Sequence, residues 1–230
     1  MTVGSLPQYS ANQALVASIH SQLAYQFGGS IAGFSQLLGA AGWTLIEMAL
    51  APGLPNQPAG SHENAFAYSA SRVLSSDRVQ FVYALRGSDK PLEDWRDWIW
   101  NNASKYGWSH YYEQVRAPFA EMLAQALAAQ AAGKSVEVIV TGHSLGGAAA
   151  QAAFADLVLP AGQGVWVDPD APLGAGSRLF SDSALAAYTS NQVRNLVSSA
   201  TTYTFGSPSL LIDPQKPTVG ELAALGFSTA

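Results

Sequence analysis

Residues 136–150 decide the fold, and they read Val136-Glu137-Val138-Ile139-Val140-Thr141-Gly142-His143-Ser144-Leu145-Gly146-Gly147-Ala148-Ala149-Ala150. Residues 136–141 are mostly β-branched and apolar, a pattern that predicts a strand. Residues 148–159 are rich in alanine and stop at Pro160, which predicts a helix. The pentapeptide between these two segments matches G-x-S-x-G, the pattern of a sharp strand-to-helix turn that exposes a serine at its tip.

This turn makes Ser144 the candidate nucleophile. Gly142 and Gly146 leave room where side chains would collide with the neighbouring strand and helix. A serine hydroxyl attacks well only when a base takes its proton, and its developing oxyanion needs donors. The N–H of Leu145 opens the helix and can supply one donor, aided by the helix dipole. His143 lies inside the turn, and we expect its side chain to point away from Ser144. The competing interpretation is a glycine-rich turn with a structural serine; the flanking strand and helix favour the nucleophile.

Further segments extend this unit into an α/β domain with a mixed sheet. A helix is predicted from Ser10, with an apolar stripe at Leu15, Ile19 and Leu23. Strands are predicted at 43–49, 66–72, 78–85 and 201–205, the middle two forming a hairpin. A long helix is predicted at 111–132, ending at a glycine, and residues 160–176 are predicted to be irregular.

Composition sets the broad limits. The 230 residues fit one domain, 1–230, and 48% hydrophobic residues are ample for a core. The net charge of −5 argues against nucleic acid as the partner. The chain has no cysteine, so disulfides and thiolate zinc sites are excluded. The N-terminal residues lack a signal-peptide pattern. We expect a secreted protein exported without such a signal, with the cytoplasm as the alternative.

Three segments together resemble the fungal-type (class 3) lipases. The first is Gly-His-Ser-Leu-Gly-Gly at 142–147. The second is 81–97, with Arg-Gly-Ser at 86–88 followed by Asp-Trp-Arg-Asp-Trp at 94–98. The third is Thr-Phe-Gly-Ser-Pro at 204–208. The secreted bacterial lipases with calcium-binding repeats share this core, and Ala-Gly-Trp-Thr at 41–44 is similar to them.

The resemblance implies an α/β-hydrolase fold with a mixed, mostly parallel sheet flanked by helices. It also implies hydrolysis of lipid or other carboxylic esters through an acyl-enzyme. Ser88, which follows Arg86-Gly87, would then supply the second oxyanion donor beside Leu145, whereas Arg86 is expected to tie loops together. The chemistry would need no cofactor, and no metal site is predicted, although a structural calcium ion remains compatible. Asp168 and Asp170 are either solvated loop acids or weak calcium ligands.

The family order of catalytic groups is Ser, Asp, His, and the last two are not evident in this chain. No histidine follows Ser144; the four histidines are His20, His62, His110 and His143. Asp213 is interpreted as a loop residue. Residues 219–225 are predicted to be a helix and 227–230 the opening of a further strand. The expectation is therefore that the domain is incomplete at its C-terminus.

Three explanations compete for the missing base. A segment beyond residue 230 or a second polypeptide completes the triad, which is the favoured reading. Alternatively, His20, His62 or His110 is recruited, since triads occur in several chain orders. The third is a catalytically incomplete protein that binds lipid or a protein partner.

Four tryptophans gather within a short segment that borders the lid in the resembling lipases: Trp95, Trp98, Trp100 and Trp108. Amphipathic aromatic side chains suit an interfacial contact with lipid. The other interpretation, held equally, is that they pack in the core beneath that lid.

Overall fold

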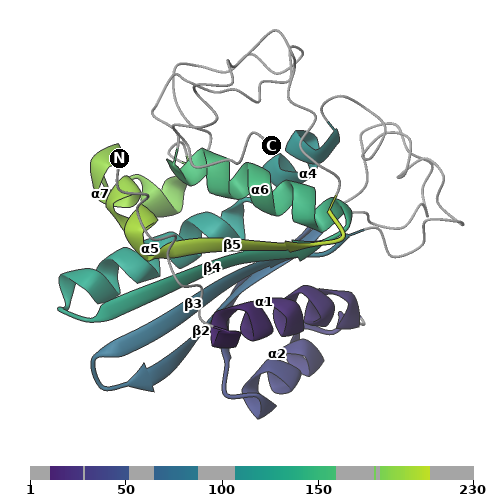
Figure 1. Ribbon diagram of the computed structural model, residues 1–230, viewed down its shortest axis with the longest axis horizontal. Coiled ribbons are helices and arrows are strands. Elements are labelled where there is room, and N and C mark those ends of the chain that lie inside the picture. The colour runs from purple at the N-terminus through teal and green to yellow at the C-terminus, as the bar shows by residue number, and fades with distance from the viewer. Residues whose placement is uncertain are drawn as a thin grey trace, which may run out of the picture.

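The computed structural model describes residues 11–27, 29–51, 65–87, 107–158, 179 and 182–207. Its sheet has the strand order β1-β2-β3-β4-β5. The strands are β1 (Thr44–Ala51), β2 (Ala65–Ser75), β3 (Arg78–Leu85), β4 (Ser135–His143) and β5 (Ala200–Phe205) (Figure 1). The pairings β1–β2 and β2–β3 are antiparallel, whereas β3–β4 and β4–β5 are parallel. Among the described strands, only β2 therefore runs against the rest, and the predicted mixed, mostly parallel sheet is confirmed.

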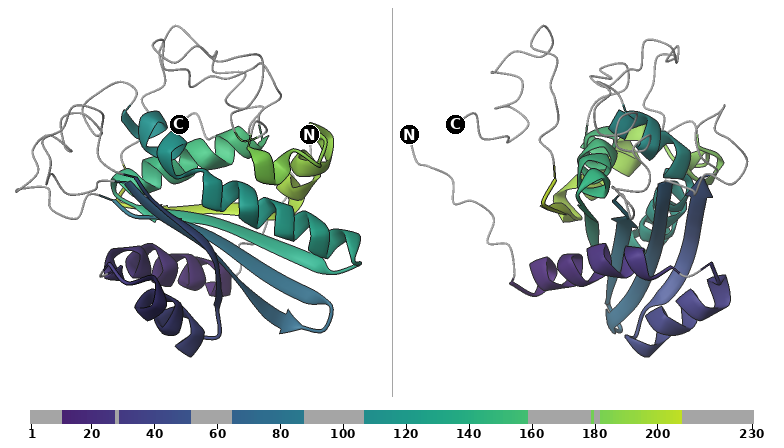
Figure 2. Two further views of the ribbon diagram at one scale, coloured as in Figure 1. Left: turned by 180° about the vertical axis from the view of Figure 1, so that it is seen from behind. Right: turned by 90° about the vertical axis from the view of Figure 1, so that its right-hand side faces the viewer.

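Helices cover both faces of the sheet, as an α/β-hydrolase-like fold requires. Helices α1 (Ala11–Leu23) and α2 (Ile31–Ala40) lie on one face, joined by the 3₁₀ turn η1 (Ala24–Gln26). Helices α4 (Gly107–Val115), α5 (Ala117–Ala131) and α6 (Leu145–Val158) lie on the other (Figures 1 and 2). A short path through η4 (Ser183–Leu185), α7 (Ser190–Arg194) and η5 (Asn195–Ser199) leads into β5.

Two hydrophobic clusters separate these layers. Phe81 and Tyr83 of β3 belong to the cluster under α4, α5 and α6, whereas Val82 and Ala84 belong to the cluster under α1 and α2. Successive side chains of a strand point to opposite faces, so both faces of β3 are buried. This explains why the central strands read as continuous apolar runs.

Most predicted elements are confirmed, and one is wrong. The hairpin and the strands at 43–49, 136–141 and 201–205 are present. The single helix predicted at 111–132 is instead two helices, α4 and α5, which break at Arg116. Pro118 causes the break, since it lacks an N–H and its ring would clash with an upstream carbonyl in a continuous helix. The sequence patterns also missed α2, which Ser30 caps by accepting a hydrogen bond from Gly33 N at 3.2 Å.

Two of the three residues in the predicted apolar stripe of α1 face outward. Leu15 and Ile19 are exposed, whereas Ala17, His20 and Ser21 are buried against the sheet. Thr141 Oγ1 of β4 donates to the carbonyl oxygen of Ala17 at 3.1 Å, which shows how closely the small residues let the helix approach. The helix was thus predicted correctly, but of its apolar stripe only Leu23 packs against the hydrophobic cluster.

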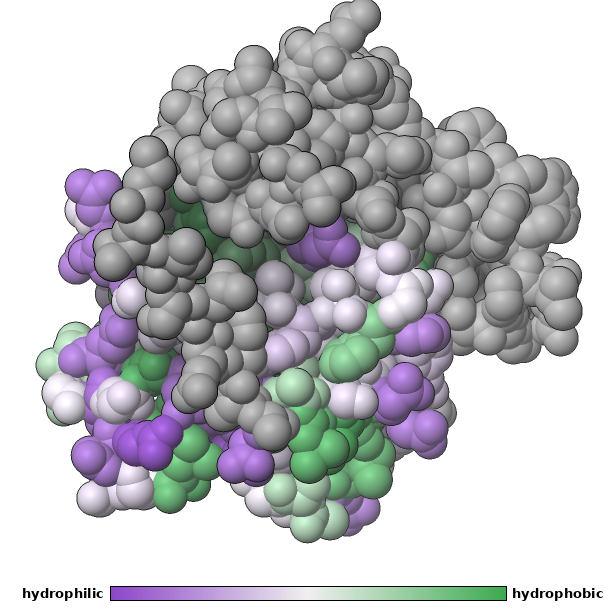
Figure 3. All heavy atoms as spheres, in the orientation of Figure 1, coloured by the Kyte–Doolittle hydropathy of each residue, from purple (hydrophilic) through white to green (hydrophobic). Residues whose placement is uncertain are grey.

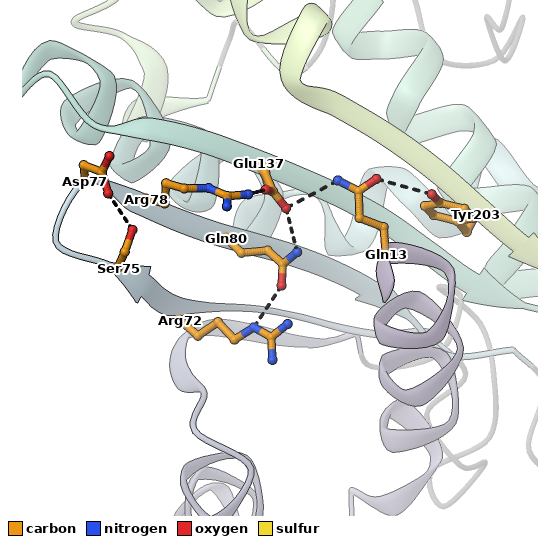
Figure 4. Close-up of polar contacts among 8 residues, drawn as sticks. All are labelled: Gln13, Arg72, Ser75, Asp77, Arg78, Gln80, Glu137 and Tyr203. Carbon is orange, nitrogen blue, oxygen red and sulfur yellow. Dashed lines mark hydrogen bonds and ion pairs between the residues drawn. The ribbon is translucent and has the colours of Figure 1, made fainter. Parts of the chain in front are cut away.

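A polar network fastens α1 to the sheet at the beginning of β4 (Figure 4). Glu137 accepts hydrogen bonds from Gln80 at 2.9 Å and from Gln13 of α1 at 3.3 Å, and it forms an ion pair with Arg78. Burial alone would raise the pKa of Glu137, but the hydrogen bonds from Arg78, Gln13 and Gln80 together lower it. Tyr203 of β5 donates to Gln13 at 3.4 Å, and Arg72 of β2 donates to Gln80 at 2.9 Å, so the network reaches four strands.

Several predictions fall outside the described residues: the irregular segment 160–176, the helix 219–225 and the strand opening at 227–230. The incomplete C-terminus and the single domain 1–230 therefore stay predictions. In the part of the chain that the structure describes, no helix combines the length and apolar character needed to cross a membrane.

Candidate active site

Ser144 occupies the single residue between β4 and α6, as the motif predicted. Its φ angle is +55°, and within the described ranges it is the one non-glycine residue with a positive φ. Its N–H donates to Phe205 O at 2.9 Å, and its carbonyl accepts from Gly147 N at 2.9 Å. A left-handed conformation at a side chain other than glycine is strained and persists only where the surroundings impose it. Here β5 and the first turn of α6 impose it.

The glycines around Ser144 are required by close backbone contacts. A Cβ on Gly142 would collide with the carbonyl of Gly146, and a Cβ on Gly146 would collide with the carbonyl of Leu85. Strand β4 and helix α6 therefore approach each other and β3 as closely as backbone atoms allow. The G-x-S-x-G pattern predicted this: side chains in place of Gly142 and Gly146 would collide with the neighbouring strand and helix.

The end of β3 lies directly against the strand-to-helix turn at residues 142–146, which we call the elbow. Leu85 pairs with Gly142, and a Cβ on Gly87 would lie only 3.0 Å from the Cβ of Ser144. Leu145 is buried at the first position of α6, where backbone N–H groups have no acceptor inside the helix. Ser88 follows Gly87 but lies outside the described residues, so its role as a donor stays a prediction, as does that of Leu145.

Tyr25 contacts both Gly87, just after β3, and His143, at the end of β4. Its hydroxyl oxygen accepts a hydrogen bond from Gly87 N at 3.0 Å. The same oxygen lies 2.9 Å from Nδ1 of His143, and the two rings meet at 67°. The sequence motifs did not point to Tyr25, because it lies in η1 and outside all of them, 62 residues before Gly87 and 118 before His143.

A second tyrosine, Tyr111, contacts the residues just after β3 from the other face of the sheet. The hydroxyl of Tyr111 on α4 contacts the carbonyl oxygen of Arg86 and lies 3.0 Å from Phe66 O. The N–H of Arg86 donates to Phe66 O at 2.9 Å, and its buried guanidinium lies 5.4 Å from the Phe66 ring. Arg86 thus helps to tie the end of β3 to β2, and its role in joining loops stays a prediction.

The two histidines whose side chains are described both have other partners. His143 is held by Tyr25. His20 is buried between α1 and β2, with Nδ1 2.7 Å from the hydroxyl of Tyr68 and its ring 4.3 Å from that of Trp43. Burial first, and then the charge of Arg72, lower the pKa of His20 to about 3. A buried imidazole that resists protonation is poorly suited to serve as the base for Ser144.

The remaining candidates cannot be placed from the described residues. His62, Asp168, Asp170 and Asp213 lie outside them, as do three of the clustered tryptophans and the side chains of Trp108 and His110. Within the described part, no group of three or more histidine or acidic side chains is arranged to hold a metal ion. The expectation that the chemistry needs no cofactor, and that a calcium ion could be structural, stays a prediction.

Comparison with known proteins bears on the same region. Residues 78–161 match the model of a family described as lipase (class 3). A solved structure titled "Crystal structure of M37 lipase" is similar over 85% of this chain and 67% of its own, with 15% sequence identity and a TM-score of 0.42. No curated protein matches the chain. The closer resemblance to fungal-type or repeat-bearing bacterial lipases stays a prediction. The family match spans β3 to α6, and it therefore supports a relationship of this chain to the class 3 lipases over the range that contains Ser144.

Proposed function

We propose that this protein is a carboxylic ester hydrolase of the lipase type, with Ser144 as its nucleophile. The observation that carries the proposal is the strained backbone of Ser144 at the strand-to-helix junction, inside the range that matches the lipase family. Strain at a single polar residue, held by glycine contacts on both sides, is a feature of functional sites rather than of ordinary turns.

The reaction would proceed through an acyl-enzyme. The proton of the Ser144 hydroxyl passes to a base while Oγ bonds to the ester carbonyl carbon. The carbonyl oxygen becomes negative and accepts hydrogen bonds from the N–H of Leu145 and from Ser88. Collapse of this intermediate expels the alcohol, which takes the proton, and water then releases the acid. No cofactor enters these steps.

The base and its acid partner are proposed to be groups other than the described side chains. His20 and His143 are both held by tyrosines, so neither is free to serve Ser144. The favoured source is a further segment or a second polypeptide, and the alternative is His62 or His110. In both cases the substrate is a lipid or another ester with an apolar acyl group.

Labelling with a fluorophosphonate tests the nucleophile. We expect one adduct, located on the peptide that contains Ser144, in the full protein and in its natural assembly. Ser144→Ala should abolish the adduct, whereas Ser198→Ala, a change at an exposed serine of η5, should leave the labelling rate unchanged. An adduct at a different residue, or its absence from the full-length parent, would overturn the proposal.

A binding protein without turnover is the second candidate, and the engagement of both described histidines favours it. It predicts saturable binding of lipid or of a protein partner with no hydrolysis of p-nitrophenyl esters. Hydrolysis that disappears in Ser144→Ala decides for the enzyme. If hydrolysis is present, losing it in His62→Ala or His110→Ala would locate the base in this chain.

A further inference from the structure

The outer side of α1 and α2 carries several exposed aliphatic side chains. Four aliphatic side chains, Leu15, Ile19, Ile31 and Leu37, have exposed fractions between 41% and 61%. We call these four residues the neutral helical face. Figure 3 shows apolar residues gathered in the lower part of the molecule, over these two helices.

This face also carries no charge. The first charged residue of the chain is Glu47, so all 11 basic and 16 acidic residues follow residue 46. The other exposed side chains on α1 and α2 are alanine, serine, asparagine and glutamine. His20, the one titratable side chain of α1, is buried on the sheet side of that helix.

The neutral helical face is connected to the candidate active site through Tyr25. The turn η1 follows α1 without a gap. Its Tyr25 contacts Gly87, which precedes the predicted oxyanion donor Ser88, and His143, which precedes the nucleophile Ser144. The layer formed by α1, η1 and α2 is therefore fixed to the strand ends next to Ser144.

We infer that the neutral helical face binds the surface of a neutral lipid or long-chain ester aggregate and brings Ser144 to it. This inference rests on the proposed function, since the aggregate is the substrate. Aliphatic side chains gain free energy when such a surface removes them from water, and a face without charges has no ions to desolvate. An anionic membrane would instead be matched by lysine and arginine. A stable protein interface is usually anchored by aromatic or arginine side chains, and none of the four residues of the neutral helical face is of these types.

The test is flotation of the full protein with triolein droplets coated with phosphatidylcholine. The Ser144→Ala background is used so that hydrolysis does not change the droplets, and binding is then independent of whether the chain is an enzyme. Leu15→Gln with Ile19→Gln keeps good helix formers on α1. It should lower the ratio of bound to free protein at least about tenfold. Ile31→Gln on α2 is an independent variant and should also lower that ratio.

The matched control is Val73→Thr with Leu74→Thr. These residues are 68% and 40% exposed on β2, next to the charged Arg72, Asp77 and Arg78, and the substitutions retain strand propensity. The control should float like the parent. Raising NaCl tenfold should not reduce flotation of the parent, because no charge pair is involved.

Four results would overturn the inference: a parent that does not float, helix variants that float like the parent, an equal loss in the control, or flotation that falls with salt. Sedimentation gives a fifth. A parent dimer that the Leu15 and Ile19 substitutions dissociate would show that a second copy of the chain occupies this face. Failure of the proposed function would appear elsewhere, as a lack of labelling at Ser144.

Discussion

The hydroxyl oxygen of Tyr25 accepts a hydrogen bond from the backbone N–H of Gly87 at 3.0 Å, although 62 residues separate them. That oxygen also lies 2.9 Å from the imidazole of His143. One phenol on the α1 side of the sheet therefore contacts the residues that immediately precede Ser88 and Ser144. Tyr25 therefore links the residue before the nucleophile to the residue before the predicted oxyanion donor.

We expect Tyr25→Phe to slow labelling of Ser144 by fluorophosphonate roughly tenfold, because the Gly87 N–H loses its acceptor and the turn can shift. If ester hydrolysis is measured, kcat should fall and KM should change little, as befits a positioning residue. Tyr188→Phe is the control, since its hydroxyl contacts Ala124 O at 3.4 Å, away from the elbow. Equal effects in the two variants, or none in Tyr25→Phe, would contradict this role.

Gly146→Ala should destabilise the protein and abolish labelling. The added Cβ meets the backbone of Leu85 and Arg86, which a rotamer change cannot relieve. We expect a loss of about 2–3 kcal/mol or more in the free energy of unfolding, measured in urea. Gly39→Ala on α2 makes the same chemical change where nothing lies within 4 Å. It should leave stability unchanged or raise it by up to about 1 kcal/mol. The idea fails if both substitutions have the same effect.

Ser144→Gly and Ser144→Ala should both abolish labelling, but the two variants should differ in stability. Ser144→Gly removes the strain of a side chain at φ +55°, whereas Ser144→Ala keeps it. We expect the glycine variant to unfold with a free energy about 1 kcal/mol higher than the alanine variant, in spite of the greater entropy of its unfolded chain. Urea denaturation of both variants measures this difference. A less stable glycine variant would show that the elbow is not strained.

His20 should make the protein less stable in mild acid. Its pKa is about 3 when folded and near 6.5 when unfolded, so between these values the unfolded chain binds more protons. The free energy of unfolding is therefore intact above pH 6.5 and falls as pH decreases, by up to about 1.4 kcal/mol per pH unit. Glu137 does not obscure this window, because its lowered pKa affects stability only below about its ordinary value of 4.5.

The measurement is urea denaturation of the parent and His20→Gln at pH 7.5 and pH 5. The variant should be the less stable protein at pH 7.5, where it loses the fit beside Tyr68 and Trp43. At pH 5 the difference between the two proteins in the free energy of unfolding should be about 2 kcal/mol smaller than at pH 7.5. A difference that does not depend on pH would show that folding does not lower the pKa of His20.

Local patterns in the sequence were enough to predict the strands of the sheet and the elbow around Ser144. Strand periodicity, the hairpin and G-x-S-x-G all depend on neighbouring residues, so they can be recognised without knowing the rest of the fold. The two errors in the predicted helices also have local causes. Pro118 splits one predicted helix. Helix α2 begins at Ile31 after its N-cap Ser30, and this capping signal is weaker than the apolar periodicity of longer helices.

Tertiary structure alone decided which residues meet at the site and which face of α1 is buried. The stripe at Leu15 and Ile19 predicted a helix, yet the sheet packs against the smaller Ala17 and Ser21 on its other side. Periodicity reveals that a helix has two faces, but the choice between them depends on how closely the partner strands approach. For the same reason Tyr25 could be linked to Gly87 and His143 only in the folded protein, where packing brings together residues that no local pattern connects.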